Sequence, residues 1–83
     1  MGWQVYIIRC ADGTLYTGVT DDMDRRLLAH REGRGARYTR GRAPLELVYQ
    51  EPCRDRSEAQ KREASIKRMP RKQKIGLIEG RVK

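Results

Sequence analysis

Arg26 and His30 lie four residues apart, and their types and spacing could do chemistry. On a helix this spacing places two side chains on one face, so a cation would lie beside an imidazole. A guanidinium is always charged and donates in a planar fork that suits two phosphate oxygens. An imidazole changes its protonation state near neutral pH. One helix edge would thus present a cation and an imidazole together.

A run of arginines interspersed with glycine is the second such feature. It spans residues 33–42 and contains Arg34, Arg37, Arg40 and Arg42. This composition is typical of a mobile loop that contacts a phosphate backbone. The whole chain carries 19 Lys and Arg against 11 Asp and Glu, a net charge of +8, which favours a polyanionic partner. Charge alone fits a solvated surface without a partner equally well.

The sequence gives little support for a cysteine-based metal or redox site, or for a membrane segment. Cys10 and Cys53 are isolated from each other and from His30, so they form neither a metal-ligand pattern nor a redox pair. We expect both cysteines to pack as small apolar residues in a reducing compartment. No segment has the pattern of a signal peptide or the length of a membrane span, which predicts a cytoplasmic protein with no membrane partner.

The elements that must position these residues begin with a β-hairpin. Two runs rich in β-branched and aromatic residues, 3–10 and 14–19, flank Ala11-Asp12-Gly13. Ala11 and Asp12 suit a type I turn, and Gly13 suits the left-handed position that follows it. Cys10 then lies opposite Thr14.

This register decides where the tyrosines point. Ile8 would lie opposite Tyr16 and Tyr6 opposite Gly18, so both tyrosines project from one face of the sheet. The other face would carry the apolar residues Val5, Ile7, Leu15 and Val19. A two-residue Asp-Gly turn would instead send the tyrosines to opposite faces.

Three further elements follow the hairpin. Thr20 resembles a helix N-cap for residues 22–31, with Met23 and Leu27 as an apolar stripe. Residues 45–49, between two prolines, predict a third strand. Asp55 with Glu58 forms a capping box before a helix over residues 57–69, whose apolar pattern includes Ala59, Ala64, Ile66 and Met69. Pro70 ends that helix and begins another. These elements predict one α+β domain over residues 1–83, with a core of about 3–78 and a three-stranded antiparallel sheet packed with helices.

The order of these features resembles the GIY-YIG nuclease superfamily, and its short stand-alone bacterial branch in particular. The signature tripeptides correspond to Gln4-Val5-Tyr6, where glutamine replaces glycine, and to Tyr16-Thr17-Gly18. The helix with Arg26 and His30 resembles the arginine helix of the family, and Ala59 with Glu63 resembles its metal-binding glutamate helix. Residues 38–42 also resemble that branch.

The resemblance implies a role for each candidate residue. Glu63 would hold one divalent cation, Mg²⁺ or alternatively Mn²⁺, and one carboxylate fits an ion that keeps several waters. Tyr6 would act as general base or orient the water, assisted by Tyr16. Because the pKa of a phenol is about 10, nearby cations such as Arg26 would have to lower it. His30 would assist proton transfer or hold the phosphate, and Tyr38 resembles a further active-site position.

Simpler roles exist for the same residues. His30 could be a surface histidine hydrogen-bonded to a neighbour, and Tyr38 could pack in its loop or stack on a base. Arg26 and Glu63 could belong to ordinary solvated helix faces. What distinguishes them is their joint occurrence with the two tyrosines.

The predicted function is a metal-dependent endonuclease that hydrolyses DNA phosphodiester bonds in repair or recombination. A compact basic domain follows backbone shape and charge better than base edges, so branched, nicked or single-stranded DNA is the expected substrate, with a possible protein partner for specificity. The alternatives are a non-catalytic nucleic-acid-binding module that uses the basic loop, and a basic protein bound to ribosomal or other RNA.

Overall fold

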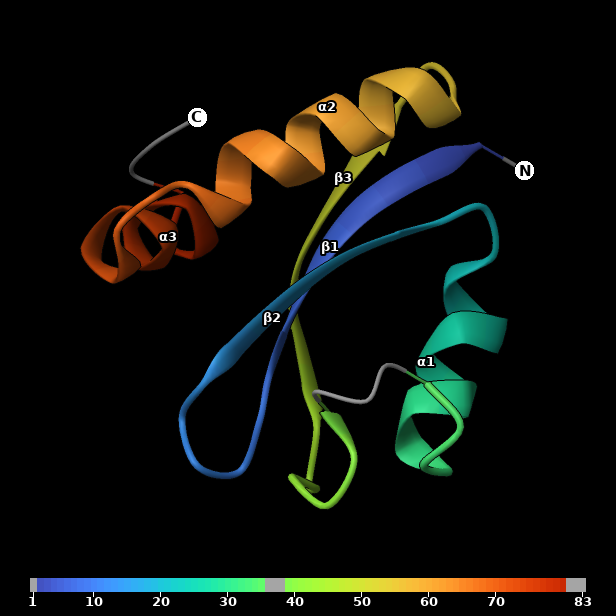
Figure 1. The fold of residues 1–83 in the computed structure, drawn as a ribbon, viewed down its shortest axis with the longest axis vertical. Coiled ribbons are helices and arrows are strands. Elements are labelled where there is room, and N and C mark those ends of the chain that lie inside the picture. The colour runs from blue at the N-terminus through green and yellow to red at the C-terminus, as the bar shows by residue number, and fades with distance from the viewer. Residues whose placement is uncertain (1, 36–38, 81–83) are drawn as a thin grey trace.

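The computed structural model describes residues 2–35 and 39–80, which form three strands and three helices. Their order is β1 (Trp3–Arg9), β2 (Leu15–Thr20), α1 (Met23–Arg31), β3 (Glu46–Cys53), α2 (Arg56–Lys67) and α3 (Arg71–Ile78). The strands form one antiparallel sheet in the order β2-β1-β3 (Figure 1). The predicted α+β fold is confirmed. No helix in the described part of the chain is long and apolar enough to cross a membrane.

The predicted hairpin register is confirmed. Gly13 has a φ of 84° and donates its N–H to Cys10 O at 2.9 Å, while Cys10 N donates to Thr14 O at 2.9 Å. Glycine adopts this left-handed conformation without steric cost. The turn thus places Tyr6 opposite Gly18, with Tyr16 on the same face of the sheet.

Each face of the sheet packs against different helices, and α1 and α2 lie on opposite sides of it (Figure 1). The face of Val5 and Ile7 forms a core with Ala59 and Ile66 of α2 and Leu77 of α3. The tyrosine face packs against α1 through Met23 and Leu27. Because side chains alternate along β1, the tyrosine face is separated from the main apolar core. Cys10 and Cys53 are both buried, and they form no disulfide with each other.

The N-cap of helix α1 lies two residues after Thr20, the predicted one. It is Asp22, whose Oδ1 accepts the Arg25 N–H at 3.2 Å. Thr20 instead uses its hydroxyl in a local turn, accepting from Asp22 N at 3.0 Å. Both residues are good N-caps, and the turn formed by Thr20 decides between them.

Strand β3 is longer than predicted and includes Pro52. Because β3 is an edge strand, the sheet tolerates a proline, which has no N–H to donate. An irregularity between Ile7 and Ile8 shifts the pairing with β3. As a result, Leu47 packs on the tyrosine face while Val48 and Tyr49 pack on the other.

Helix α2 has the predicted N-cap, because Asp55 Oδ1 accepts the Glu58 N–H at 2.8 Å. It ends at Lys67, earlier than predicted. Ala59 and Ile66 face the sheet, but Ala64 is exposed, so its assignment to the apolar face was wrong. Ala64 lies five residues after Ala59, which on a helix turns it away from the face that Ala59 and Ile66 share.

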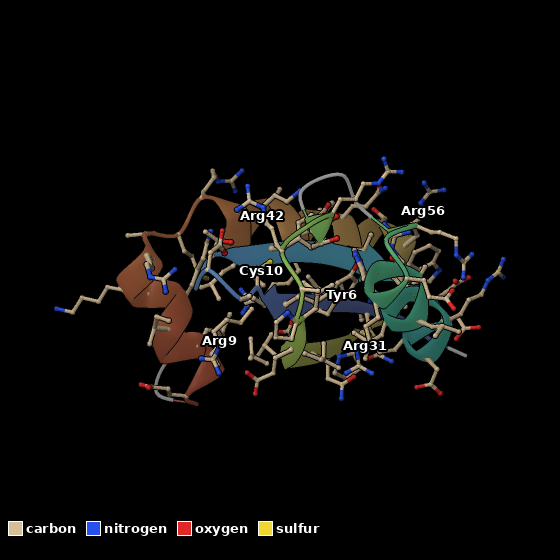
Figure 2. The ribbon with its side chains drawn as sticks, turned by 90° about the horizontal axis from the view of Figure 1, so that it is seen from below. Tyr6, Arg9, Cys10, Arg31, Arg42 and Arg56 are labelled. Carbon is tan, nitrogen blue, oxygen red and sulfur yellow. The ribbon has the colours of Figure 1, made fainter. Side chains whose placement is uncertain are left out.

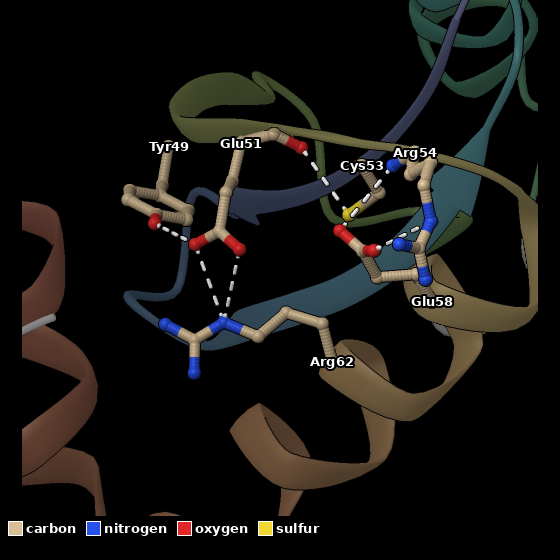
Figure 3. A network of polar contacts seen from close by, with 6 residues as sticks. All are labelled: Tyr49, Glu51, Cys53, Arg54, Glu58 and Arg62. Carbon is tan, nitrogen blue, oxygen red and sulfur yellow. Dashed lines mark hydrogen bonds and ion pairs between the residues drawn. The ribbon is translucent and has the colours of Figure 1, made fainter.

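A polar bridge ties α2 to β3. Arg62 Nε lies 3.2 Å from both carboxylate oxygens of Glu51, and Tyr49 donates its hydroxyl to the same carboxylate at 2.5 Å (Figure 3). The Arg62 and Glu51 side chains are only 22% and 31% exposed. Since Arg62 is adjacent to Glu63, this bridge also fixes the part of α2 that carries the candidate metal ligand.

Candidate active site

The Tyr6 hydroxyl lies between an arginine and a histidine from α1. Arg26 Nε donates to the hydroxyl oxygen at 3.3 Å, and His30 Nε2 lies 2.8 Å from the same oxygen. Tyr6 and His30 are almost fully buried, at 1% and 2% exposure. Figure 2 shows Tyr6 in the middle of the molecule, between the sheet and α1. The predicted helix edge therefore points at the tyrosine, and the alternative of a surface histidine is excluded.

Tyr6 and Tyr16 reach this position because Gly18 has no side chain. A Cβ at residue 18 would lie 2.6 Å from the Tyr6 hydroxyl oxygen and 3.1 Å from Cε2 of Tyr16. The ring of Tyr16 lies 6.3 Å from that of Tyr6 and 5.4 Å from that of His30. The glycine of the second tripeptide thus provides room for the ring of the first.

The sequence did not predict two residues that contact His30. Thr39 is buried, and its Oγ1 lies 2.9 Å from His30 Nδ1. Gly35 packs against the imidazole so closely that a Cβ there would lie 2.7 Å from His30 Cγ. Sequence alone offered one weak signal, a threonine and a glycine among arginines, because their contacts with His30 arise only from the path of the loop.

Burial dominates the electrostatics of this cluster. It raises the pKa of Tyr6 above its ordinary value of 10.0, and this effect outweighs the hydrogen bond from Arg26, which lowers the pKa. The contact with Arg26 therefore acts in the predicted direction, and in the protein alone burial outweighs it. Burial, followed by the charge of Arg26, lowers the pKa of His30 below 6.5. At neutral pH the site holds a neutral phenol beside a neutral imidazole.

Glu63 lies on α2, and its charge acts on the same tyrosine. Its charge is close enough to raise the pKa of Tyr6, after the larger effects of burial and Tyr16. The Glu63 side chain is 23% exposed, and its Oε2 lies 3.4 Å from Lys67 Nζ. Within residues 2–35 and 39–80 no group of three or more His, Cys, Asp or Glu side chains could enclose a metal ion. A cation at Glu63 would therefore take most of its ligands from water and substrate oxygens, which suits Mg²⁺.

The basic loop is less free than predicted. Arg34 pairs with Glu32, Arg40 donates to Gly33 O at 3.1 Å, and Arg42 pairs with Asp12 at 2.5 Å. These contacts hold the described part of the loop against α1 and the hairpin turn. Arg42 is one of the labelled arginines at the outside of the molecule (Figure 2). The candidate residues Arg37 and Tyr38 lie outside the described residues.

A second group of cations lies where α2 meets α3. Arg68, Arg71 and Lys72 are exposed, and among the ion pairs of the described chain none involves them. Residues 67–74 contain five Lys or Arg and no acid. These three residues lie five to nine positions after Glu63 in the sequence, at and beyond the end of α2.

Comparison with known proteins identifies the arrangement. Residues 2–75 match the GIY-YIG catalytic domain family. The chain belongs to the GIY-YIG family. The match includes both tripeptides, the arginine helix and Glu63, which confirms the predicted resemblance. Nuclease activity, a nucleic-acid substrate and use of a divalent metal are general properties of GIY-YIG domains.

Bacterial relatives are similar over nearly the whole chain. A UPF0213 protein from Desulfotalea psychrophila is 55% identical over 78 residues, which are 93% of this chain and 71% of the relative. The solution NMR structure of the UPF0213 protein from Bacillus halodurans has a TM-score of 0.62 and 43% identity, covering 95% of this chain and 84% of that one. The NMR structure of a protein from E. faecalis has a TM-score of 0.67 and 39% identity, covering 96% and 85%. This GIY-YIG chain therefore falls in the small bacterial branch that its sequence predicted.

Proposed function

We propose that this GIY-YIG chain is a metal-dependent endonuclease that hydrolyses phosphodiester bonds of DNA. The observation that carries the proposal is the Tyr6 hydroxyl, which lies 3.3 Å from Arg26 Nε and 2.8 Å from His30 Nε2. Hydrolysis needs a deprotonated water, neutralisation of charge on the phosphoryl oxygens and stabilisation of the departing oxygen. The described chain has a suitable group for each need.

The proton path runs from water to Tyr6 to His30. Neutral His30 accepts the phenol proton at Nε2, and the tyrosinate accepts a proton from the attacking water. Arg26, which donates to the phenol oxygen, stabilises the tyrosinate as its proton leaves. Water is thereby deprotonated although burial raises the pKa of Tyr6. Tyr16 flanks the cluster on the β2 side, with its ring 6.3 Å from that of Tyr6 and 5.4 Å from that of His30.

Arg26 and Glu63 would act on the phosphate. The guanidinium of Arg26 contacts both Tyr6 and Tyr16, and its further N–H groups suit the scissile phosphate. Glu63 would hold a divalent ion, Mg²⁺ or Mn²⁺, whose charge favours the departing oxygen. Glu63 is half-buried beside Lys67, so it keeps an accessible carboxylate.

We further propose that the enzyme acts on branched, nicked or single-stranded DNA, in repair or recombination. The proposed contacts with the backbone are Arg34, Arg37, Arg40 and Arg42 of the loop together with the exposed cations of the α2–α3 turn. Such contacts fix position on the backbone and carry no base sequence. Tyr38 is proposed as a further active-site residue, and a protein partner could add specificity.

A cleavage panel tests this function. Labelled duplex, nicked, flap and single-stranded DNA, with matched RNA, are incubated with Mg²⁺ or Mn²⁺. Arg26→Ala and Glu63→Gln should each abolish nicking while most binding remains. The matched controls are Arg31→Ala on the exposed end of α1 and Glu58→Gln on α2, which should both cleave normally.

Three outcomes would contradict the proposal. Cleavage that persists in both site variants would trace the activity to a contaminant. Binding without cleavage by the wild type, in either metal, would leave a nucleic-acid-binding module. Cleavage confined to RNA would retain the chemistry and overturn the substrate.

A further inference from the structure

We propose that Thr39 is a positioning residue that fixes the tautomer of His30, so that His30 Nε2 is the nitrogen that accepts the Tyr6 proton. This inference rests on the proposed function for its catalytic meaning, but its structural content can be tested without cleavage.

The hydrogen bonds of the Tyr6 hydroxyl determine which ring nitrogen of His30 is protonated. The phenol oxygen accepts from Arg26 Nε at 3.3 Å, and a guanidinium has donors only. The phenol hydrogen therefore needs an acceptor elsewhere, and His30 Nε2 at 2.8 Å is the acceptor that the described residues provide. A buried hydroxyl that leaves its hydrogen unpaired is costly, so Nε2 carries the lone pair.

Thr39 forms the hydrogen bond on the other side of the imidazole ring. If Nε2 is unprotonated in a neutral imidazole, Nδ1 carries the hydrogen. Thr39 Oγ1, 2.9 Å from Nδ1, accepts it. Thr39 is only 2% exposed, so water does not readily replace the hydroxyl as this partner. After proton transfer from Tyr6, the imidazolium keeps the same Nδ1 hydrogen bond.

The fold holds Thr39 in place. Arg42 N donates to Thr39 O at 3.3 Å, and Ala11 N donates to Arg42 O at 2.8 Å. The Arg42 side chain also pairs with Asp12 in the hairpin turn. The segment that carries Thr39 is thus attached to the same hairpin that carries Tyr6. Gly35 packs on the imidazole and blocks its displacement on that side.

Among the described residues, the polar and titratable groups that face His30 come from two strands, from α1 and from the loop after α1. They are Tyr6 of β1, Tyr16 of β2, Arg26 of α1 and Thr39 of the loop. Tyr6 contacts Nε2, and Arg26 donates to the hydroxyl of that tyrosine. Thr39 is the group that distinguishes the two ring nitrogens at Nδ1.

The test is a ¹⁵N NMR spectrum of the ring of His30, the one histidine in the chain. Two-bond correlations separate protonated from unprotonated ring nitrogens. At pH 7.5 the wild type should show the Nδ1–H tautomer. Thr39→Val keeps the side-chain shape but removes the acceptor, and should shift the tautomer ratio about tenfold toward Nε2–H. Thr39→Ser should restore the wild-type spectrum.

Kinetics add a second measurement on an active substrate. Thr39→Val should lower kcat about tenfold or more with little change in KM, because the substrate contacts of Arg26 and Glu63 are unaffected. Thr39→Ser should recover most of kcat. A merely structural role would change the stability of Thr39→Val without changing the tautomer.

Several results would overturn the inference. One is a wild-type His30 that is the Nε2–H tautomer or doubly protonated at pH 7.5, which needs no variant to observe. Another is a Thr39→Val protein that keeps the Nδ1–H tautomer. If no substrate is cut but the tautomer follows Thr39 as stated, the nuclease proposal fails while the role of Thr39 in orienting His30 holds.

Discussion

The Tyr6 ring lies directly over Gly18 of the neighbouring strand, so that a Cβ at residue 18 would come within 2.6 Å of the phenol oxygen. Gly18 is not among the glycines with positive φ, so its backbone conformation does not require glycine. The need for glycine here comes from the close approach of the Tyr6 ring. The second tripeptide of the GIY-YIG signature therefore shapes the position of the tyrosine in the first.

We predict that Gly18→Ala displaces Tyr6 and lowers cleavage about a hundredfold, because misplacement of a reacting group by about 1 Å has such effects. Overpacking should also lower the free energy of unfolding by about 1–3 kcal/mol. Nicking rates and urea unfolding measure the two effects. Gly2→Ala is the control, since a Cβ there would meet nothing closer than 4.0 Å. Equal behaviour of the two variants would contradict the close-packing argument.

The buried His30 predicts a pH dependence of stability. In the unfolded chain the pKa of His30 is near 6.5. In the folded protein, burial and the charge of Arg26 lower this pKa. Between these values only the unfolded chain binds the proton, so the free energy of unfolding falls as the pH decreases below about 6.5, by at most about 1.4 kcal/mol per pH unit. Above that range His30 adds no slope.

Urea unfolding from about pH 5 to 7.5 measures this slope, and His30→Gln removes the contribution of the imidazole. The carboxylates add their own slope to both proteins, so the difference between wild type and variant isolates His30. Parallel curves for the two proteins would show that His30 titrates alike in the folded and unfolded states.

Two Arg–Glu pairs near α2 should differ in strength. The Arg62–Glu51 pair is 22% and 31% exposed, whereas Arg54–Glu58 is 82% and 45% exposed (Figure 3). Double-mutant cycles with glutamine at each position should give a coupling of about 1 kcal/mol for the first pair and below about 0.5 kcal/mol for the second. Unfolding free energies supply the measurement. A larger coupling for the exposed pair would refute the role of burial.

The two cation groups should contribute differently to binding. Arg34, Arg40 and Arg42 would have to exchange a contact with a protein group for each phosphate that they bind, so neutral glutamine at those three positions should reduce the slope of log K against log salt by less than one for each arginine. The same change at Arg68, Arg71 and Lys72 should reduce the slope of log K against log salt by about one for each phosphate that the variant no longer binds. Fluorescence anisotropy without divalent metal measures both triple variants, and a larger effect of the loop triple would reverse this assignment.

Local sequence rules determined much of the fold. The alternation along β1, with the three-residue turn at Gly13, placed Tyr6 and Tyr16 on one face, and the four-residue spacing of Arg26 and His30 placed them on one helix edge. These features depend on neighbours a few residues apart, which a sequence displays directly. The N-cap of α1 was missed by two residues because Thr20 and Asp22 both suit that position.

Only the tertiary structure decided how these side chains meet. That His30 is buried, that Thr39 contacts its Nδ1 and that Gly35 packs on its ring follow from the path of the loop across the sheet. The upward shift of the Tyr6 pKa likewise depends on burial under α1, which outweighs Arg26. Desolvation and close contact are properties of groups brought together from distant parts of the chain, so no local pattern encodes them.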